Sequence, residues 1–258
     1  MIDVARILEI GRKSTLRVGV GLPLGLATST RKQLSAIHSD LKIDSFDDPH
    51  LLVLALKDGT IDAAVRGTMS SAKVLGELKR EFSMNALMRT AILESSKGKP
   101  FLLTPVGIDE GRDFESRLRL VLSTLSYFSA AGWRLEVAVL SKGRPEDRSR
   151  SKEIEMSLDE GEKLTLRLKK DGLKAEHLGI LLEEAVSKAD VVVAPDGVSG
   201  NLIFRAMHFV GGGKAYGAPV VNMKRVFVDT SRAKTDFTDS ILLAAGLVSV
   251  KAGLQRRP

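Results

Sequence analysis

The chain alternates short, almost purely apolar runs with longer stretches whose apolar residues recur every three or four positions. Runs of the first kind are typical of strands buried on both faces, and the longer stretches are typical of amphipathic helices. Strands that alternate with helices form mainly parallel sheets with helices on both faces, so we expect an α/β fold. The expected strands are Leu16–Val20, Ile61–Val65, Phe101–Thr104, Leu135–Leu140, Val191–Val193 and Val226–Val228.

The longer periodic stretches predict helices over residues 114–128, 158–170, 175–187 and 239–252. In the second of these, Leu164, Leu166 and Leu168 also alternate as in a strand, but the whole stretch favours a helix. Residues 141–152 are charged and contain Gly143 and Pro145, so we expect a loop there.

Charge favours an anionic partner, because 39 Lys and Arg outnumber 32 Asp and Glu and give a net charge of +7. Phosphorylated small molecules, nucleic acids and anionic membrane surfaces all fit such a charge. Aromatic residues make up only 5% of the chain, whereas single-stranded nucleic acids are usually bound by stacking on aromatic rings. We therefore rank nucleic acid last and expect a phosphorylated or acyl small molecule.

The chain has no cysteine, which excludes disulfides, thiolate metal sites and a cysteine nucleophile. Its four histidines lack the spacing of metal ligands, so we expect no metal site and no tightly bound cofactor. No apolar run approaches the roughly 18 residues that span a membrane, and the first residues do not resemble a secretory signal. We expect a cytoplasmic protein without a membrane partner.

The segment Val65–Ala72 follows an expected strand directly and leads into a helix. Such a corner directs backbone N–H groups and the positive end of the helix toward one point, where an anion can bind. Gly67 permits a close backbone approach, Ser70 and Ser71 can donate hydroxyl hydrogen bonds, and Arg66 can bind a phosphate with two donors. Alternatively, Ser71 only caps the helix.

The segment Val191–Asn201 has the same form, with a buried strand, a glycine-containing turn and a helix that we expect to begin near Asn201. Ligands of open α/β sheets collect at the carboxyl ends of strands, where Asp196 and Asn201 would project. Alternatively, Asp196 and Gly197 form a turn and Asn201 caps the helix.

The segment 227–239 follows the last expected strand and contains Ser231, Arg232 and several carboxylates. A serine beside an arginine suits a phosphoryl or carbonyl oxygen, and a nearby aspartate such as Asp239 can act as a base. Alternatively, this is a solvated loop in which Asp239 or Thr238 caps the final helix.

Together the three segments resemble the phosphate acetyl- and butyryltransferase family and its relative, acyl-acyl-carrier-protein:phosphate acyltransferase. The resemblance is carried by Asp196-Gly-Val-Ser-Gly200-Asn201, by Asp229 with Ser231, Arg232 and Asp239, and by the glycine loop at Arg66–Ser71. It implies two α/β domains that meet at a cleft, as in isocitrate and isopropylmalate dehydrogenases. The first domain would comprise residues 1–95 and 222–258, with 96–221 inserted as the second, and a homodimer is usual.

The resemblance also implies roles for individual residues. Asp239 would deprotonate the thiol of coenzyme A, the thiolate would attack an acyl phosphate, and Arg232 would neutralise the developing negative charge. Ser231 and Ser71 would position the phosphate, and Asn201 would lie at the floor of the cleft. The remaining residues expected to contact substrate are Arg66, Gly67, Ser70, Asp196 and Gly200.

The chain also resembles a subgroup of short proteins from methanogenic archaea, described as methanogenesis markers or methyltransferase-related proteins. Where the transferases continue Ser-Arg-Gly, this chain has Ser231-Arg232-Ala233-Lys234, with one extra residue before Asp239. An alternative therefore stays open, an accessory protein that kept the fold without acyl transfer and acts with a methyltransferase partner. The apolar residues 240–249 would be a dimer contact if they are not core.

Overall fold

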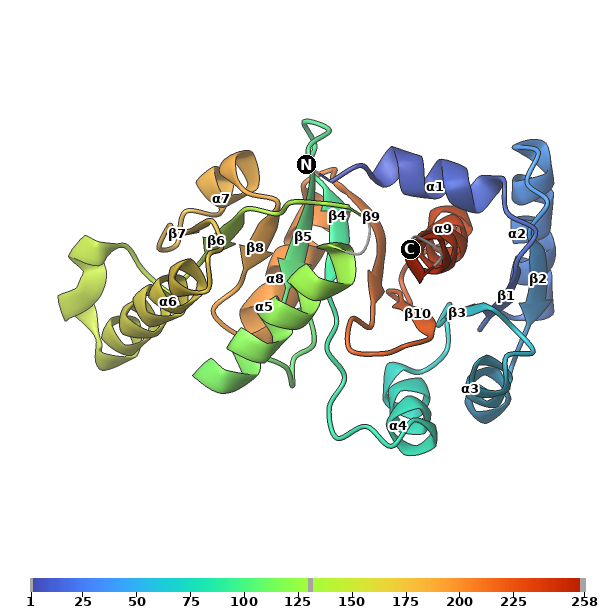
Figure 1. Ribbon diagram of the computed structural model, residues 1–258, viewed down its shortest axis with the longest axis horizontal. Helices are drawn as coiled ribbons and strands as arrows, with labels where there is room; N and C mark the ends of the chain where they lie inside the picture. Colours follow the sequence, from blue (N-terminus) through green and yellow to red (C-terminus); the bar gives the residue numbers. More distant parts are fainter. Residues whose placement is uncertain (1, 130–131, 256–258) are drawn as a thin grey trace. The chain divides into compact units, whose positions relative to one another are not determined.

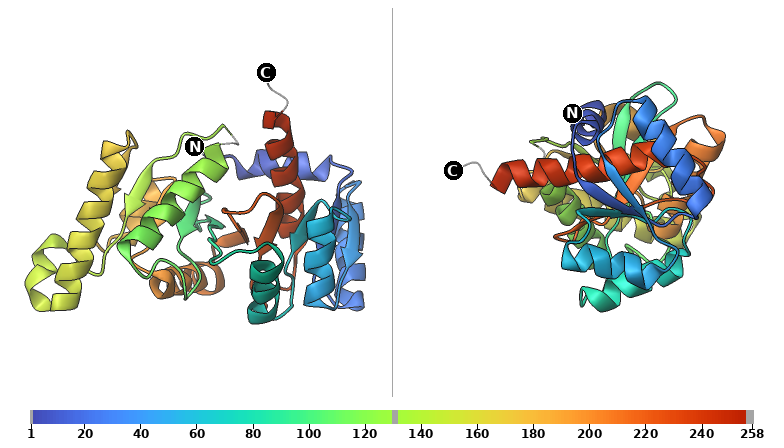
Figure 2. Two further views of the ribbon diagram at one scale, coloured as in Figure 1. Left: turned by 60° about the horizontal axis from the view of Figure 1, so that its bottom comes forward. Right: turned by 90° about the vertical axis from the view of Figure 1, so that its right-hand side faces the viewer.

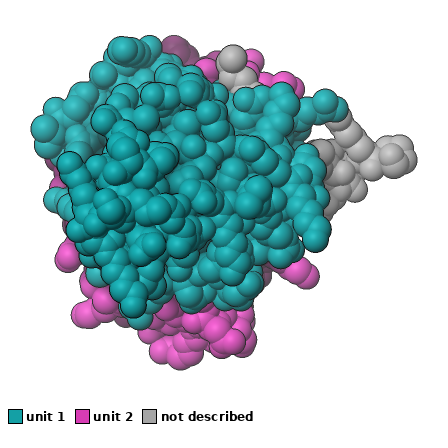
Figure 3. Space-filling view, turned by 90° about the vertical axis from the view of Figure 1, so that its left-hand side faces the viewer, with its two compact units in different colours: residues 1–2, 88–215 teal, residues 3–87, 216–258 magenta. Residues whose placement is uncertain are grey.

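The structure is a computed structural model that describes residues 2–129 and 132–255. The chain divides into two compact units, unit 1 with residues 1–2 and 88–215 and unit 2 with residues 3–87 and 216–258 (Figure 3). The chain passes into unit 1 near residue 88 and back into unit 2 near residue 216, compared with the expected bounds of 96 and 222.

Unit 2 is built on a sheet with the strand order β2-β1-β3-β10-β9. Neighbouring strands are parallel from β2 to β10, and only β9 is antiparallel to its neighbour β10. Consecutive apolar residues with buried side chains explain the central strands, because both of their faces are covered. The strands are β1 (Arg17–Val20), β2 (Lys42–Ser45), β3 (Ala63–Val65), β9 (Lys214–Pro219) and β10 (Val226–Asp229).

Helices cover both faces of this sheet, as the right-hand view of Figure 2 shows. Helix α9 lies against β3 and β10, and α1 packs on α9, while α3 and α4 pack against each other on the other face. The side chains of Ile241, Leu243 and Ala244 in α9 are fully buried, so this helix forms the centre of the unit's core. The helices are α1 (Val4–Arg12), α2 (Leu24–Ala36), α3 (Pro49–Asp58), α4 (Ser71–Glu81) and α9 (Thr238–Gln255).

Unit 1 is built on a sheet with the strand order β4-β5-β8-β6-β7 (Figure 1). The strands from β5 to β7 are parallel, and β4 is antiparallel to β5. The strands are β4 (Ala91–Glu94), β5 (Pro100–Thr104), β6 (Val137–Val139), β7 (Ala175–His177) and β8 (Val191–Val193).

The helices of unit 1 follow these strands in the chain. The α-helices are α5 (Phe114–Ser129), α6 (Lys152–Lys170), α7 (Leu182–Lys188) and α8 (Gly197–Arg205). A short 3-10 helix, η1 (Pro145–Arg150), precedes α6, and a π-helical turn, η2 (Ala206–Val210), continues α8. The expected α/β fold with mainly parallel sheets is therefore confirmed.

Two expectations about local structure are wrong. Residues 175–187 do not form one helix, because 175–177 form strand β7 and α7 begins only at Leu182. Gly179 separates the two with a φ of +57°, in the left-handed region where a helix cannot continue. Residues 141–152 are not a plain loop either, since they contain η1, and Ser151 caps α6 by accepting from the Ile154 N–H at 3.2 Å.

Among the described residues, no helix combines the length and the apolar character needed to cross a membrane.

Candidate functional site

Three neighbouring parallel strands of unit 2 end at the same edge of the sheet. Val20 of β1 lies beside Val65 of β3, and Val65 lies beside Val228 of β10. The loops that follow are joined by hydrogen bonds, from the Thr68 N–H to the Gly21 carbonyl at 2.9 Å and from the Thr230 hydroxyl to the Gly67 carbonyl at 3.0 Å. Two of the three segments singled out in the sequence therefore meet at this edge.

Arg66, expected to bind a phosphate, is buried and already engaged by protein atoms. Its Nε donates to the carboxylate of Asp229, and its Nη1 donates to the Met69 carbonyl at 2.6 Å. The same Asp229 oxygen accepts from the Thr230 N–H at 2.9 Å. The guanidinium thus ties the end of β3 to the end of β10, and its role toward a phosphate stays a prediction.

Gly67 allows the loop after β3 to lie close to the backbone of Gly21. Its φ of +62° lies in the left-handed region, and a Cβ there would collide with the Gly21 carbonyl. Gly21 is constrained by space, since a Cβ at that position would collide with the Arg66 carbonyl. Glycine at both positions lets the loops after β1 and β3 touch.

Ser70 and Ser71 lie at the start of α4, which begins at Ser71. Both are half-buried, and Ser70, the residue before the helix, makes no capping hydrogen bond with its side chain. Within residues 2–129 and 132–255, neither hydroxyl has a hydrogen-bond partner. The capping alternative for Ser71 is not what the structure shows, and two hydroxyls remain beside the positive end of a helix.

Ser231 and Arg232 lie in a turn directly after β10. The turn is closed by the Lys234 N–H, which donates to the Ser231 carbonyl at 3.2 Å, and the Ala233 N–H donates to the Ser231 hydroxyl at 3.2 Å. The Arg232 side chain is exposed and forms no ion pair with the described residues. It is a cation that can meet an anion at the same edge as Ser70 and Ser71.

Asp239, the expected base, lies half-buried in the first turn of α9. The capping role falls to Asp236, whose carboxylate accepts from the Thr238 N–H at 2.8 Å. The structure places Asp239 on the helix that follows the Arg232 turn, and its role as a base stays a prediction.

Lys234 is the residue of this edge that sequence reasoning missed. Its ammonium donates to the hydroxyl of the fully buried Ser240 at 2.9 Å. Burial lowers the pKa of Lys234, while Asp239 and Asp236 act in the opposite direction. The only signal in the sequence was that Ala233-Lys234 stands where the transferases have glycine.

The other three expected site residues belong to unit 1, where Asp196 caps α8. Its carboxylate accepts from the Ser199 N–H at 2.7 Å and pairs with the Lys142 ammonium at 3.2 Å. Burial alone raises the pKa of Asp196, but the Ser199 N–H and Lys142 outweigh it and lower the pKa. Lys142 also pairs with Glu153 at 2.7 Å, and these contacts raise its pKa.

Gly200 and Asn201 hold α8 against the loop after β5. A Cβ at Gly200 would collide with the Pro105 carbonyl, and the Asn201 Nδ2 donates to the Val106 carbonyl at 2.9 Å. Asn201 lies within α8, which starts at Gly197, so the helix begins earlier than expected and Asn201 does not cap it. The missing side chain at Gly200 and the hydrogen bond of Asn201 therefore allow α8 to pack closely on this loop.

A buried arginine supports the loop that carries Asp196. Arg117 of α5 donates from Nη1 to the Pro195 carbonyl at 2.7 Å and from Nη2 to Glu160. No sequence pattern indicated this contact, because it joins residues 78 positions apart.

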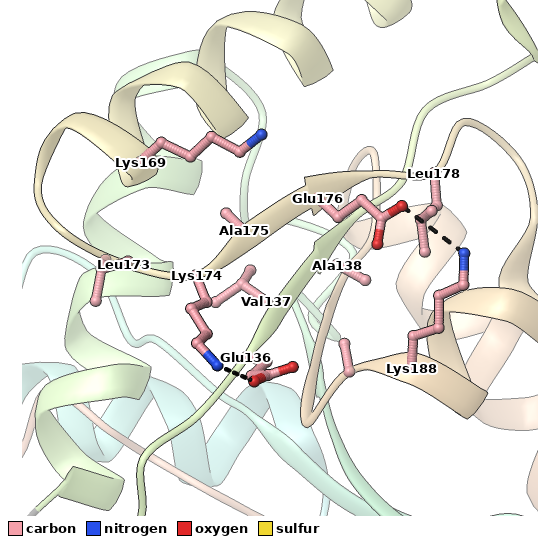
Figure 4. Close-up of a pocket in the computed structure, with 11 residues that line it drawn as sticks. Glu136, Val137, Ala138, Lys169, Leu173, Lys174, Ala175, Glu176, Leu178 and Lys188 are labelled. Carbon is pink, nitrogen blue, oxygen red and sulfur yellow. Dashed lines mark hydrogen bonds and ion pairs between the residues drawn. The ribbon is translucent and has the colours of Figure 1, made fainter.

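Two hollows in the surface lie away from the loops that carry the expected site residues. Figure 4 shows one of about 300 Å³ in unit 1, where Lys174 pairs with Glu136 and Lys188 pairs with Glu176. A second, of about 420 Å³, lies in unit 2 among residues such as Arg31 and Lys42. Neither is lined by an expected site residue.

One group of side chains in the described residues is close enough together to hold a metal ion, namely His50, Glu77 and Glu81. Cations already neutralise it, because Arg80 pairs with Glu77 and Lys57 pairs with Glu81 at 3.1 Å.

The fold is that of the phosphotransacylases. A branched-chain phosphotransacylase from Enterococcus faecalis matches with a TM-score of 0.71 over 90% of this chain and 99% of that chain, at 18% identity. A phosphotransacetylase from Streptococcus pyogenes matches with a TM-score of 0.66 over 96% and 100%, at 12% identity. At such identities, the likeness is one of fold alone.

Sequence similarity points to a smaller group of proteins than the fold does. No family model matches the chain. It is 39% identical over 219 residues to a Methanosarcina mazei protein named "putative methyltransferase mtx subunit X", covering 84% of this chain and 78% of that protein. A Methanosarcina barkeri protein of the same name is 37% identical over 240 residues, covering 93% and 85%. The chain belongs to the mtx subunit X family, which confirms the resemblance to the methyltransferase-related proteins of methanogens.

Proposed function

We propose that the protein binds an acyl phosphate or a coenzyme A-type anion at the carboxyl edge of unit 2 and transfers an acyl group between phosphate and a thiol. The observation that carries the proposal is the exposed, unpaired Arg232 at the edge where the hydroxyls of Ser70 and Ser71 also lack partners in the described part of the chain. Cations and free donors at a helix start suit a phosphate. The fold shared with phosphotransacylases supports the same chemistry.

In the proposed reaction, Asp239 takes the proton of the thiol. The thiolate attacks the acyl carbonyl, a C–S bond forms, the C–O bond to phosphate breaks, and phosphate leaves with the bonding pair. Arg232 stabilises the negative oxygen of the intermediate and the leaving phosphate, and Ser231 and Ser71 donate to phosphate oxygens. Arg66 and Gly67 hold the loop in place through contacts within the protein, and the proposal keeps both as residues that contact the phosphate.

Asp196, Gly200 and Asn201 of unit 1 stay proposed substrate-binding residues. Coenzyme A and acyl phosphate are substrates in this scheme rather than resident cofactors.

The test is thermal stabilisation by inorganic phosphate, coenzyme A, acetyl-coenzyme A and S-adenosylmethionine. A ligand at 100 times its Kd stabilises by about 2.7 kcal/mol, which a melting curve resolves easily. We expect phosphate or coenzyme A to raise the Tm of wild type and of Arg6→Ala, an exposed arginine on α1, but not of Arg232→Ala. Equal shifts in wild type and Arg232→Ala would refute the proposal.

A second candidate is an accessory protein that acts with a methyltransferase. It is favoured by the name that relatives carry, which describes a methyltransferase subunit. This candidate predicts no shift with phosphate or coenzyme A, and co-purification of a methyltransferase identified by mass spectrometry. Recovery of only this chain would count against it.

We also propose that the protein forms a homodimer. Residues 240–249 cannot supply the contact, because most of them lie in the core of unit 2. Exposed apolar side chains instead gather on α8 and η2, with Leu202 62% and Val210 86% exposed, and such surfaces often mark an interface with a second copy. Light scattering should give a dimer mass for wild type and for Leu51→Glu on α3, and a monomer mass for Leu202→Glu.

A further inference from the structure

The side chain of Lys234 turns inward at the start of α9. Its ammonium donates to the Ser240 hydroxyl at 2.9 Å, and that hydroxyl donates its single proton to the Tyr216 carbonyl at 2.6 Å. Ser240 therefore accepts from Lys234 and cannot donate to it. This chain of hydrogen bonds joins the loop after β10 to α9 and to β9.

The backbone of the same residue closes the turn that carries Arg232. The Lys234 N–H donates to the Ser231 carbonyl, so Lys234 holds the turn with both its backbone and its side chain. Arg232 and Ala233 form the exposed tip, and the inner end of the turn is fixed at Ser240.

Stability alone does not explain a lysine at this position. The half-buried Lys234 ammonium loses part of its hydration, and it lies close to the positive end of α9, whose first turn begins at Thr238. Asp236 and Asp239 offset part of this cost. A methionine would fill similar space without losing the hydration of a charge, so the lysine contributes something that an apolar side chain cannot.

We propose that Lys234 is a positioning residue, which fixes the Ser231–Arg232 turn against the start of α9 so that Arg232 and Asp239 face the same anionic ligand. The proposal rests on the proposed function for its ligand, but its structural part is measurable without one. No bond to substrate is assigned to Lys234 itself.

The first measurement is backbone dynamics by ¹⁵N relaxation without ligand. We expect order parameters near those of rigid backbone, about 0.85, at residues 231–234 of wild type, and values below about 0.6 in Lys234→Met. Lys251→Met is the matched control, because Lys251, which lies on α9, is also half-buried and its pKa is also lowered by burial. Unchanged order parameters in Lys234→Met would overturn the proposal whether or not any ligand binds.

The second measurement is the Kd for phosphate and coenzyme A by calorimetry. Lys234→Met should keep the Tm of wild type within a few degrees and bind at least tenfold more weakly, Ser240→Ala should weaken binding less, and Lys234→Arg should restore part of it. Rescue by arginine separates positioning by a charged donor from simple filling of space. Wild-type affinity in Lys234→Met, with Arg232→Ala inactive in binding, would overturn the role of Lys234 and leave the proposed function standing. Absence of binding in wild type would refute the proposed function, while the relaxation data still decide on Lys234.

Discussion

Arg66 and Asp229 form a buried ion pair between the carboxyl ends of β3 and β10. The pair is satisfied on both sides, because Arg66 also donates to the Met69 carbonyl and Asp229 also accepts from the Thr230 N–H. It therefore fixes the two loops that frame the candidate site. Arg66 thus stabilises the framework of the site, its contact with a phosphate stays a prediction, and Arg232 is an exposed cation at the same edge.

This pairing predicts strong coupling between the two residues. Removing one partner leaves an unpaired buried charge, so Arg66→Met and Asp229→Leu should each lower the free energy of unfolding by about 3–5 kcal/mol. The double variant should lose clearly less than the sum of the two, because no charge is left unpaired. Urea unfolding of the four proteins measures this, and additive losses would contradict the pairing.

Gly67 should not tolerate a side chain. Gly67→Ala combines a positive φ with a collision against the Gly21 carbonyl and should destabilise the protein by about 2 kcal/mol or more. Gly25→Ala is the control, because Gly25 lies in α2 with open space where its Cβ would be, and alanine favours helices. Equal Tm values for the two variants would show that the loop contact is not needed.

Substitutions of the two acidic residues at the start of α9, Asp236 and Asp239, should have different effects on rate and stability. Asp239→Asn should lower the rate of acyl transfer by about a hundredfold or more, as loss of a general base does, while phosphate binding persists. Asp236→Ala should lose the hydrogen bond from the Thr238 N–H and about 1 kcal/mol of stability, with little change in rate. A spectrophotometric thiol assay measures the rates, and a reversed pattern would assign the base to Asp236.

Asp196 should make stability depend on pH in the acid range. Its pKa is lowered in the folded state, so its ionised form contributes stability above the ordinary value of 3.8, and this contribution is lost as pH falls through the lowered value. Asp196→Asn keeps a capping side chain but lacks the charge. Urea midpoints should therefore differ between wild type and variant at pH 7 and converge well below pH 3.8. A constant difference across this range would contradict the assignment.

The α/β class and the site-bearing strands were predictable from the sequence, because buried parallel strands such as Val191–Val193 are nearly pure apolar runs. The segment 175–187 misled, since Leu178, Leu181 and Leu182 have helical spacing while Gly179 prevents a continuous helix. Local periodicity does not reveal the positive φ of Gly179, nor that a Cβ at this position would collide with the Gly143 carbonyl.

The sequence indicated which loops carry the candidate site residues, but not which of their side chains already have hydrogen-bond or ion-pair partners in the protein. Polar residues after strands indicated the loops of Ser70, Ser71 and Arg232, and the pairing of β3 with β10 places both loops at one edge. The partner of Arg66 lies 163 residues away, and only the register of β3 beside β10 shows that Asp229 neutralises it. The hydrogen bonds from Lys234 to Ser240 and from Ser240 to Tyr216 likewise join residues that no local pattern connects.

The strand order of unit 2 also has a consequence for how the chain is made. Strand β10 lies between β3 and β9, and α9 supplies the core, yet both come from residues 216–258. On a ribosome, residues 3–87 therefore emerge without the strand and helix that complete their sheet, while 88–215 emerge later and in one piece. The sheet of unit 2 therefore stays incomplete, with apolar strand edges uncovered, until residues 216–258 have been synthesised.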